Sequence, residues 1–522
     1  MFNLLSEINS DTLAISLVII ILFTLITAVL AFVAVFLIGK YHSVDDEDTL
    51  KVGKLKIGYM IAILLVIGLA VRLLLTFTVN GYGASYNTVY TIANNVINVN
   101  DGFGGYTSSF IGVAPLMGYL YTLFGGWGVA LGVGQDDIAM QLFVKLPYLL
   151  SDIAMFFVLY WILKKYVNRY VALTLSGLYF LSPLSFVMSA MWGSEYALLA
   201  LGLVLTFYFL LTKNVFGMTV AMSLSCLVSS DAVYMAPVVA VYLVYAFVKA
   251  IIKIVKTKPS FDMLFKDSSL YNVLYVPLCM ALGVALIYLL ALPAYFADGV
   301  VSFAAVMEQL FVKPFLYTSG EGALYYFTEN GLSIYTIFMQ NYATLGTNFP
   351  TLAFAGIFVF LVAVSANCPK FIVTVIFLLR RNRANILLLS SYVSLTVGVY
   401  CIGASEWTLV PSLALMLLAF AVVKDKRLLK VYAVMSVFIV LNALLVMFGG
   451  GQITPVYTEG YFNMTENGAL NVFSVLLSVL TVLMHIYCTV VVLDVALTKN
   501  RKPFLTDTAS SCGEIVRHWV RG

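Results

Sequence analysis

The chain has 522 residues, of which 62% are hydrophobic and only 10% are charged, and its formal net charge is +4. Apolar runs of about 18 or more residues recur from one end to the other, which excludes a soluble globular protein and predicts an all-α polytopic membrane protein. The six cysteines form no CxxC pair, and the three histidines are His42, His485 and His518. We therefore expect no disulfide framework, no metal site and no nucleic-acid partner.

The first apolar run, from Leu13, is too long for a signal peptide and lacks a basic n-region and a small-residue cleavage site, so we expect a retained membrane span. Similar runs follow it and predict a bundle of about thirteen transmembrane helices. They lie at residues 12–38, 57–79, 141–163, 170–188, 194–212, 214–230, 232–256, 273–295, 351–380, 385–403, 407–423, 430–449 and 470–497.

The distribution of basic residues predicts which connections face the cytoplasm. Lys and Arg cluster in alternate connections, and the positive-inside rule places these in the cytoplasm, with the N-terminus outside and the C-terminus inside. The basic clusters lie at residues 40–56, 164–169, 213, 249–258, 380–383, 424–430 and 499–502. The remaining connections include long outer loops at 80–140 and 296–350, and Lys313 is the one clear cation among them.

The first outer loop begins with the polar stretch GYGASYNTVYTIANNVINVNDGFGGYTSSF, which contains no Lys or Arg. In this loop Val89, Ile92 and Val96 are spaced along one helical face, and the later stretch APLMGYLYTLFGG is apolar with two tyrosines. We expect one or two helices here that lie in the membrane interface instead of crossing the bilayer.

Short motifs follow one another in a characteristic order between residues 60 and 425. They read AVRLLLTFTVNGYGASYNT, GGYTSSFIGVAPLMGYLYTL, KLPYLLSDIAMFF, LSPLSFVMSAMWGSEYALL, SSDAVYMAP, FTENGLSIYTIF and GASEWTLVPSLAL. As an ordered set they resemble the motifs of bacterial GT-C membrane glycosyltransferases, the relatives of protein O-mannosyltransferases and GPI mannosyltransferases. The resemblance implies an extra N-terminal helix and linker at 1–56, a GT-C-like module at 57–425, C-terminal helices at 426–498 and a cytoplasmic tail at 499–522.

The same resemblance implies a reaction in which a polyprenyl-phosphate sugar donates its sugar to an acceptor hydroxyl, with no further cofactor. The catalytic acid that the family carries in the first outer loop falls at Ser85 in this chain. The substrate-binding positions that the resemblance implies are Arg72, Tyr82, Tyr106, Trp192, Glu195, Asn330 and Trp407. Several further family positions carry other residue types here, namely Ser194, Tyr196, Ser229, Asp231, Ser405 and Trp407.

Two chemical requirements favour a degenerate site. A carboxylate has to accept the proton of the attacking hydroxyl, and Ser85 cannot do so without a strong base beside it. Cations have to stabilise the departing lipid phosphate, yet the outer side offers Lys313 and, at helix ends, Arg72 or Lys145. We therefore expect a pseudoenzyme or accessory subunit in cell-surface glycan assembly, which keeps a lipid groove and serves a partner membrane enzyme.

Two other functions are compatible with the sequence. An active glycosyltransferase could use a relocated base at Asp101, Asp231 or Glu406. A transporter or channel is suggested by acidic residues at helix ends, but it would need inverted repeats or matching broken helices, and the sequence shows none. For any of the three functions, we expect an integral protein of a prokaryotic plasma membrane in contact with membrane lipid.

Single residues also have structural interpretations. Arg72 either binds substrate or snorkels to the interface, and Asp152 pairs either with a neighbouring helix or with a ligand. Glu195, Asp231 and Glu406 either converge in an acidic pocket or are solvated at three helix ends. The tyrosines of the first outer loop either stack on sugar rings or belong to an aromatic belt.

Overall fold

Helices make up nearly all of the regular structure in the part of the chain that the structure describes, which confirms the all-α polytopic class. The computed structural model describes residues 10–40, 57–79, 89–95, 114–135, 137–257, 268–295, 300–311, 317–319, 322–324, 328–338, 385–401, 403–448 and 472–497.

Seven helices in these residues are long and apolar enough to cross a membrane, and their positions match seven of the expected spans. A helix rises about 1.5 Å per residue, so about 20 residues cover the hydrocarbon core of a bilayer. In chain order the seven are α2 (Ser10–Lys40), α3 (Ile57–Thr78), α7 (Ile138–Leu163), α12 (Ala236–Thr257), α14 (Ser268–Tyr295), α21 (Lys426–Phe448) and α22 (Val472–Leu497). Together they identify an integral membrane protein with several spans.

The apolar stretch at 170–188, which the sequence predicts as a span, is broken in the structure. It forms α8 (Arg169–Phe180) and α9 (Pro183–Phe186), and α9 continues directly as the π-helix η2 (Val187–Trp192). The two parts are bent by 44°. Between them Ser182 caps α9, which opens with a proline that has no N–H to continue the helical ladder. If the bent pair counts as one span, the described residues hold eight candidate spans.

The expected count of about thirteen spans is therefore too high for the described part of the chain. Four of the expected spans are apolar helices of 14 to 17 residues, which are shorter than a straight span requires. These are α10 (Tyr196–Thr212), α11 (Val215–Val228), α19 (Asn385–Tyr400) and α20 (Val410–Val423). The expected span at 351–380 lies outside the described residues.

The first outer loop contains the helices that its sequence predicts. Residues 89–95 are helical, and Val89 and Ile92 are both buried. A second helix, α6 (Pro115–Ala130), follows and packs against α7, α11 and α14. That these helices lie in the membrane interface stays a prediction.

The strands are short, and one pair of them joins distant parts of the sequence. β1 (Tyr317–Ser319) and β2 (Gly322–Leu324) pair in antiparallel fashion, whereas β3 (Thr328–Glu329) and β4 (Ala404–Ser405) are parallel. The remaining short helices are η3 (Ser230–Met235), α15 (Phe303–Phe311) and α16 (Tyr335–Phe338).

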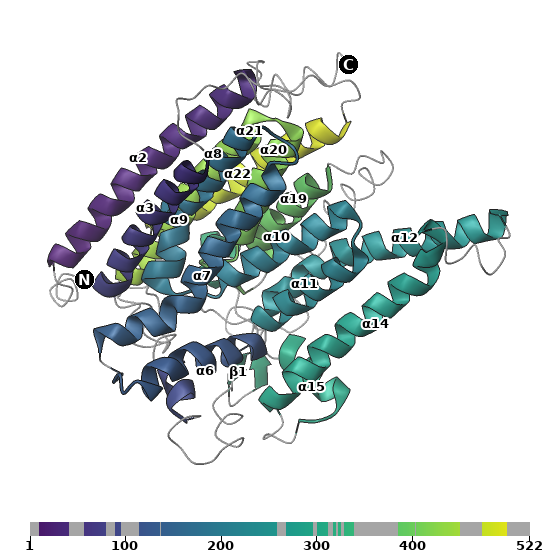
Figure 1. Cartoon of the computed structure of the whole chain (residues 1–522), viewed down its shortest axis with the longest axis horizontal. Helices are drawn as coiled ribbons and strands as arrows, with labels where there is room; N and C mark the ends of the chain where they lie inside the picture. Colours follow the sequence, from purple (N-terminus) through teal and green to yellow (C-terminus); the bar gives the residue numbers. More distant parts are fainter. Residues whose placement is uncertain are drawn as a thin grey trace.

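Helix α20 lies in the core of the bundle, and every residue from 410 to 421 is buried. It packs against α10, α19 and α21. Figure 1 shows α2 along one flank of the bundle and the pair of α12 and α14 on the opposite side. Few of the side chains in these flanking helices are buried within the protein, as expected for helices that contact lipid.

Candidate functional site

Three connections between helices meet at the hydroxyl group of Tyr196. Tyr196 begins α10 and donates a hydrogen bond to the carboxylate of Asp231 in η3. The Tyr196 hydroxyl oxygen in turn accepts a hydrogen bond from the Ser405 hydroxyl of β4 at 3.0 Å. Thr408 Oγ1 lies 3.3 Å from the same Tyr196 oxygen. The residues of these three connections, which we call the joint cluster, are 192–196, 229–231 and 404–408.

Aromatic packing holds the connection at 192–196 against the connection at 404–408. The rings of Trp192 and Trp407 meet edge to face, with centroids 5.3 Å apart, and both side chains are buried. Gly193 follows Trp192 with φ of +77°, a left-handed conformation that side chains disfavour. A β-carbon there would find ordinary contact distances to Tyr148 and Lys145. Backbone conformation, and not lack of space, is therefore what favours glycine between η2 and α10.

Two carboxylates of the joint cluster, on Glu195 and Asp231, are half-buried close to each other. Burial raises the pKa of Glu195, and the nearby charge of Asp231 raises it further, although a hydrogen bond to the backbone opposes the shift. Burial also raises the pKa of Asp231, against the lowering effect of the Tyr196 hydroxyl. Among the described residues, no basic side chain forms an ion pair with either carboxylate. The arrangement therefore favours proton uptake over permanent ionisation.

Two tyrosines extend this cluster toward α6 and α7. Tyr148 donates a hydrogen bond to the hydroxyl of Tyr121 at 2.9 Å, and both side chains are buried. Burial raises the pKa of Tyr121, and the charge of Glu195 contributes to the same shift. The phenol pair and the carboxylate of Glu195 therefore lie within electrostatic range of one another.

Asn330 reaches the joint cluster through its backbone. It has φ of +59°, which asparagine tolerates better than most residues, and it forms an isolated bridge to Ser405. Its carbonyl oxygen accepts a hydrogen bond from Asn442 Nδ2 at 2.8 Å. Gly331 lets the chain pass close to the carbonyl group of Ala404. These contacts connect the segment around residue 330 to α21 and β4.

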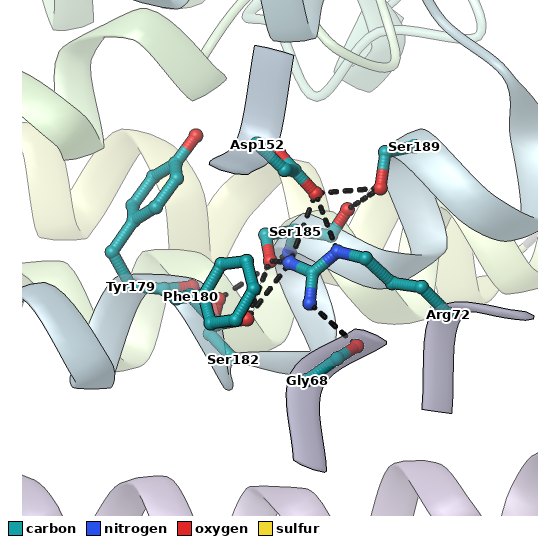
Figure 2. A network of polar contacts seen from close by, with 8 residues as sticks. All are labelled: Gly68, Arg72, Asp152, Tyr179, Phe180, Ser182, Ser185 and Ser189. Atoms are coloured by element: carbon teal, nitrogen blue, oxygen red, sulfur yellow. Dashed lines mark hydrogen bonds and ion pairs between the residues drawn. The ribbon is translucent and has the colours of Figure 1, made fainter. Parts of the chain in front are cut away.

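Arg72 lies in a separate polar network inside the bundle (Figure 2). Its Nε donates to Asp152 Oδ2 at 3.0 Å, and its Nη2 lies 2.9 Å from the same oxygen. Nη2 also donates to the Phe180 carbonyl at 2.8 Å and to Ser185 Oγ at 2.6 Å. Nη1 donates to the Gly68 carbonyl at 3.1 Å. Since all three nitrogens have acceptors within the protein, Arg72 connects α3 to α7, α8 and α9.

The Arg72 network includes an aromatic contact and a serine. The guanidinium carbon lies 4.0 Å from the centroid of the Phe180 ring. Ser189, in η2, donates to Asp152 Oδ2 at 2.6 Å. Arg72 and Asp152 are essentially inaccessible to solvent. Asp152 is thus paired with a neighbouring helix, one of the two interpretations that its sequence allowed.

Lys145 is also buried and bound to backbone. Its Nζ donates to the carbonyl of Val79 at 2.6 Å and lies 3.5 Å from that of Thr76. These carbonyls belong to the C-terminal end of α3, where the helix has no internal donors left. Lys145 therefore caps α3 and is not directed toward solvent.

The structure brings together six of the candidate residues that the sequence analysis named. Asp231 and Glu195 share the acidic part of the joint cluster, and Glu406 is half-buried beside Ser405 and Trp407. The six are Trp192, Glu195, Asp231, Asn330, Glu406 and Trp407. Arg72 lies apart from them in its own network. Four others, Tyr82, Ser85, Asp101 and Tyr106, lie outside the described residues.

Sequence reasoning missed the groups that hold the cluster together. The motif comparison marks Tyr196 only as a replacement for a family acid, and no sequence pattern singles out Thr408. Tyr148 follows Lys145 by three residues, a spacing that places both on one face of α7. That spacing was the available signal, since the sequence already marked Lys145 as a helix-end cation.

Comparisons of the chain with protein-family models and with curated proteins find no match. The resemblance to GT-C glycosyltransferases therefore stays a prediction from sequence motifs. Within the described ranges, no group of three or more His, Cys, Asp or Glu side chains could hold a metal ion.

The two carboxylates give an expected pH dependence of stability. Because burial raises both pKa values above the roughly 4 of an unfolded chain, the folded state holds more protons than the unfolded state. The contribution of the two carboxyl groups to the free energy of unfolding is complete below about pH 4. This contribution is lost as the pH rises through their pKa values in the folded protein. The double variant Glu195→Gln/Asp231→Asn should flatten this slope when the free energy of unfolding is measured between about pH 4 and 8.

Asp137→Asn is the matched control, because Asp137 is exposed at the start of α7 and accepts no capping hydrogen bond. This variant should keep the slope of the parent protein. An unchanged slope in the Glu195→Gln/Asp231→Asn variant would show that the two carboxylates are solvated.

Proposed function

We propose that this membrane protein has a GT-C-like bundle, binds a polyprenyl-linked sugar and acts as a non-catalytic accessory subunit in cell-surface glycan assembly. The observation that supports the absence of catalysis is the state of Arg72 and Lys145. Both cations are buried, and their nitrogens are bonded to acceptors of the protein itself.

Sugar transfer from a polyprenyl phosphate leaves a phosphate anion that the protein has to stabilise. Recruiting Arg72 for this purpose would leave Asp152 buried without its counter-ion, and removing one partner of a buried pair costs about 3–5 kcal/mol. Recruiting Lys145 would leave the end of α3 without its cap. Each cation therefore has a structural role that competes with binding of a phosphate.

The joint cluster suits recognition of a sugar by its hydroxyl groups. Glu195 and Asp231 provide hydrogen-bond acceptors that remain partly exposed, and the hydroxyl group of the buried Tyr196 holds the Asp231 side chain in place. A carboxylate accepts hydrogen bonds from neutral hydroxyl groups without a cation being present. Binding without transfer is thus chemically consistent with the residues that meet there.

The test uses the full-length protein in lipid nanodiscs with a polyprenyl-phosphate mannose and a hydroxyl acceptor. We expect saturable binding of the donor and no transfer above the level of empty nanodiscs. Binding should weaken in Asp231→Ala and persist in Asp137→Ala. Failure to bind the donor would contradict the proposal, and so would transfer that disappears in Ser85→Ala or Glu406→Ala.

A second candidate is an active glycosyltransferase with a relocated base, and Asp231 favours it by a specific feature. A general base works best when its pKa approaches the working pH, and burial raises the pKa of Asp231 in that direction. In this case sugar transfer would be measurable, and its rate would decrease at pH values below the pKa of the base in the folded protein. Asp231→Asn would lower the rate of transfer at least about 100-fold. Tyr196→Phe would shift the pH profile of the transfer.

A further inference from the structure

Three lysines lie along one face in the second half of α12. Lys249, Lys253 and Lys256 are spaced by four and three residues, which places them within one narrow helical stripe. Lys249 and Lys256 are exposed, and Lys253 is half-buried. Over seven residues the stripe extends for about 10 Å along the helix.

Helix α12 itself contains no acidic residue. The chain has no Asp or Glu between Asp231 and Asp262. The helix that packs beside α12 is α14, and it contains no charged residue at all. Neither of these two helices therefore supplies an acidic side chain to Lys249 or Lys256.

Aliphatic side chains next to the lysines are exposed as well. They lie on the helix surface to one side of the lysine stripe. The exposed members are Val248, Ile251, Ile252 and Val255. Since the helix from Val238 to Thr257 is a candidate membrane span, these side chains have the surroundings of lipid chains, and the lysines lie toward one end of the span.

We propose that this lysine stripe of α12 binds the phosphate headgroup of anionic phospholipids from the surrounding bilayer. Lysine side chains reach along a helix toward the headgroup layer while their methylene stems stay in contact with apolar groups. An anionic lipid satisfies both parts of the surface at once, because its phosphate pairs with the ammonium groups and its chains cover the aliphatic residues. A free phosphate ion satisfies only the first part.

The test counts lipids bound to the full-length protein by native mass spectrometry, after release from nanodiscs of phosphatidylcholine mixed with phosphatidylglycerol. We expect enrichment of phosphatidylglycerol, with about a fivefold preference for each lysine near the headgroups. The triple variant Lys249→Gln/Lys253→Gln/Lys256→Gln should lose at least about tenfold of this enrichment. The corresponding Lys→Arg triple should keep it.

The charge-matched control replaces three lysines elsewhere on the side that the positive-inside rule assigns to the cytoplasm. It is Lys164→Gln/Lys426→Gln/Lys430→Gln, which changes the net charge equally and leaves α12 intact. Equal losses in the two triples, or full enrichment in the α12 triple, would overturn the proposal. So would competition by inorganic phosphate as effective as that by the lipid. If the α12 triple fails to fold, Lys256→Gln alone should still lower the enrichment about fivefold.

Discussion

Replacing Asp152 by alanine should lower the free energy of unfolding by about 3–5 kcal/mol. The substitution leaves the Arg72 guanidinium without its counter-ion in a site that excludes solvent. A buried charge without a partner is among the most costly defects that a folded protein can contain. The measurement is a denaturant titration of the protein in mixed micelles, followed by tryptophan fluorescence.

Asp137→Ala on the same helix is the control and should change stability by less than about 0.5 kcal/mol, since Asp137 is exposed and does not cap α7. The double replacement Arg72→Met/Asp152→Leu should recover most of the lost stability, because apolar residues often substitute for a buried ion pair without penalty. If Asp152→Ala costs no more than Asp137→Ala, the Arg72 network does not stabilise the bundle.

Replacing Arg427 by methionine should be at least as costly, about 3–5 kcal/mol or more. Arg427 Nη2 lies 2.8 Å from Asp425 and 2.7 Å from Asp494, and all three side chains are buried. The substitution removes the guanidinium group from between two buried carboxylates. It also removes the ion pair between the start of α21 and α22, because Asp494 belongs to α22. The same titration in micelles measures the loss.

Lys430→Met is the control for this position, since Lys430 is exposed on the next turn of α21. Arg427→Lys should fall between the two, because an ammonium group retains the charge but cannot bind both carboxylates in the fork geometry of a guanidinium. A cost for Arg427→Met that equals the cost for Lys430→Met would mean that the three charged side chains make no net contribution.

The long spans could be predicted from the sequence, because about 20 apolar residues in a row leave few alternatives to a transmembrane helix. The shorter apolar helices α10, α11, α19 and α20 also lie at predicted positions, but hydropathy did not show that they are too short for a straight span. Hydropathy also does not register the break before Pro183, because Ser182 and Pro183 end one helix and begin the next without adding a charge.

The candidate site was predictable in part. The sequence marked Glu195, Asp231 and Trp407 as residues at the joints between helices, and the structure places these joints together. It did not indicate that Tyr196 would connect them, since a tyrosine at the start of an apolar helix is common. Arg72 and Asp152 are 80 residues apart in sequence, and a single sequence contains no signal that pairs them.

Lys145 and Tyr148 make one turn of α7 a common anchor for two other helices. Lys145 is bonded to the carbonyl group of Val79 at the end of α3, and Tyr148 is bonded to Tyr121 of α6. Because Lys145 and Tyr148 are one turn apart, α3 and α6 are held at neighbouring points of the same helix. A local change in the geometry of this turn would therefore displace both helices together.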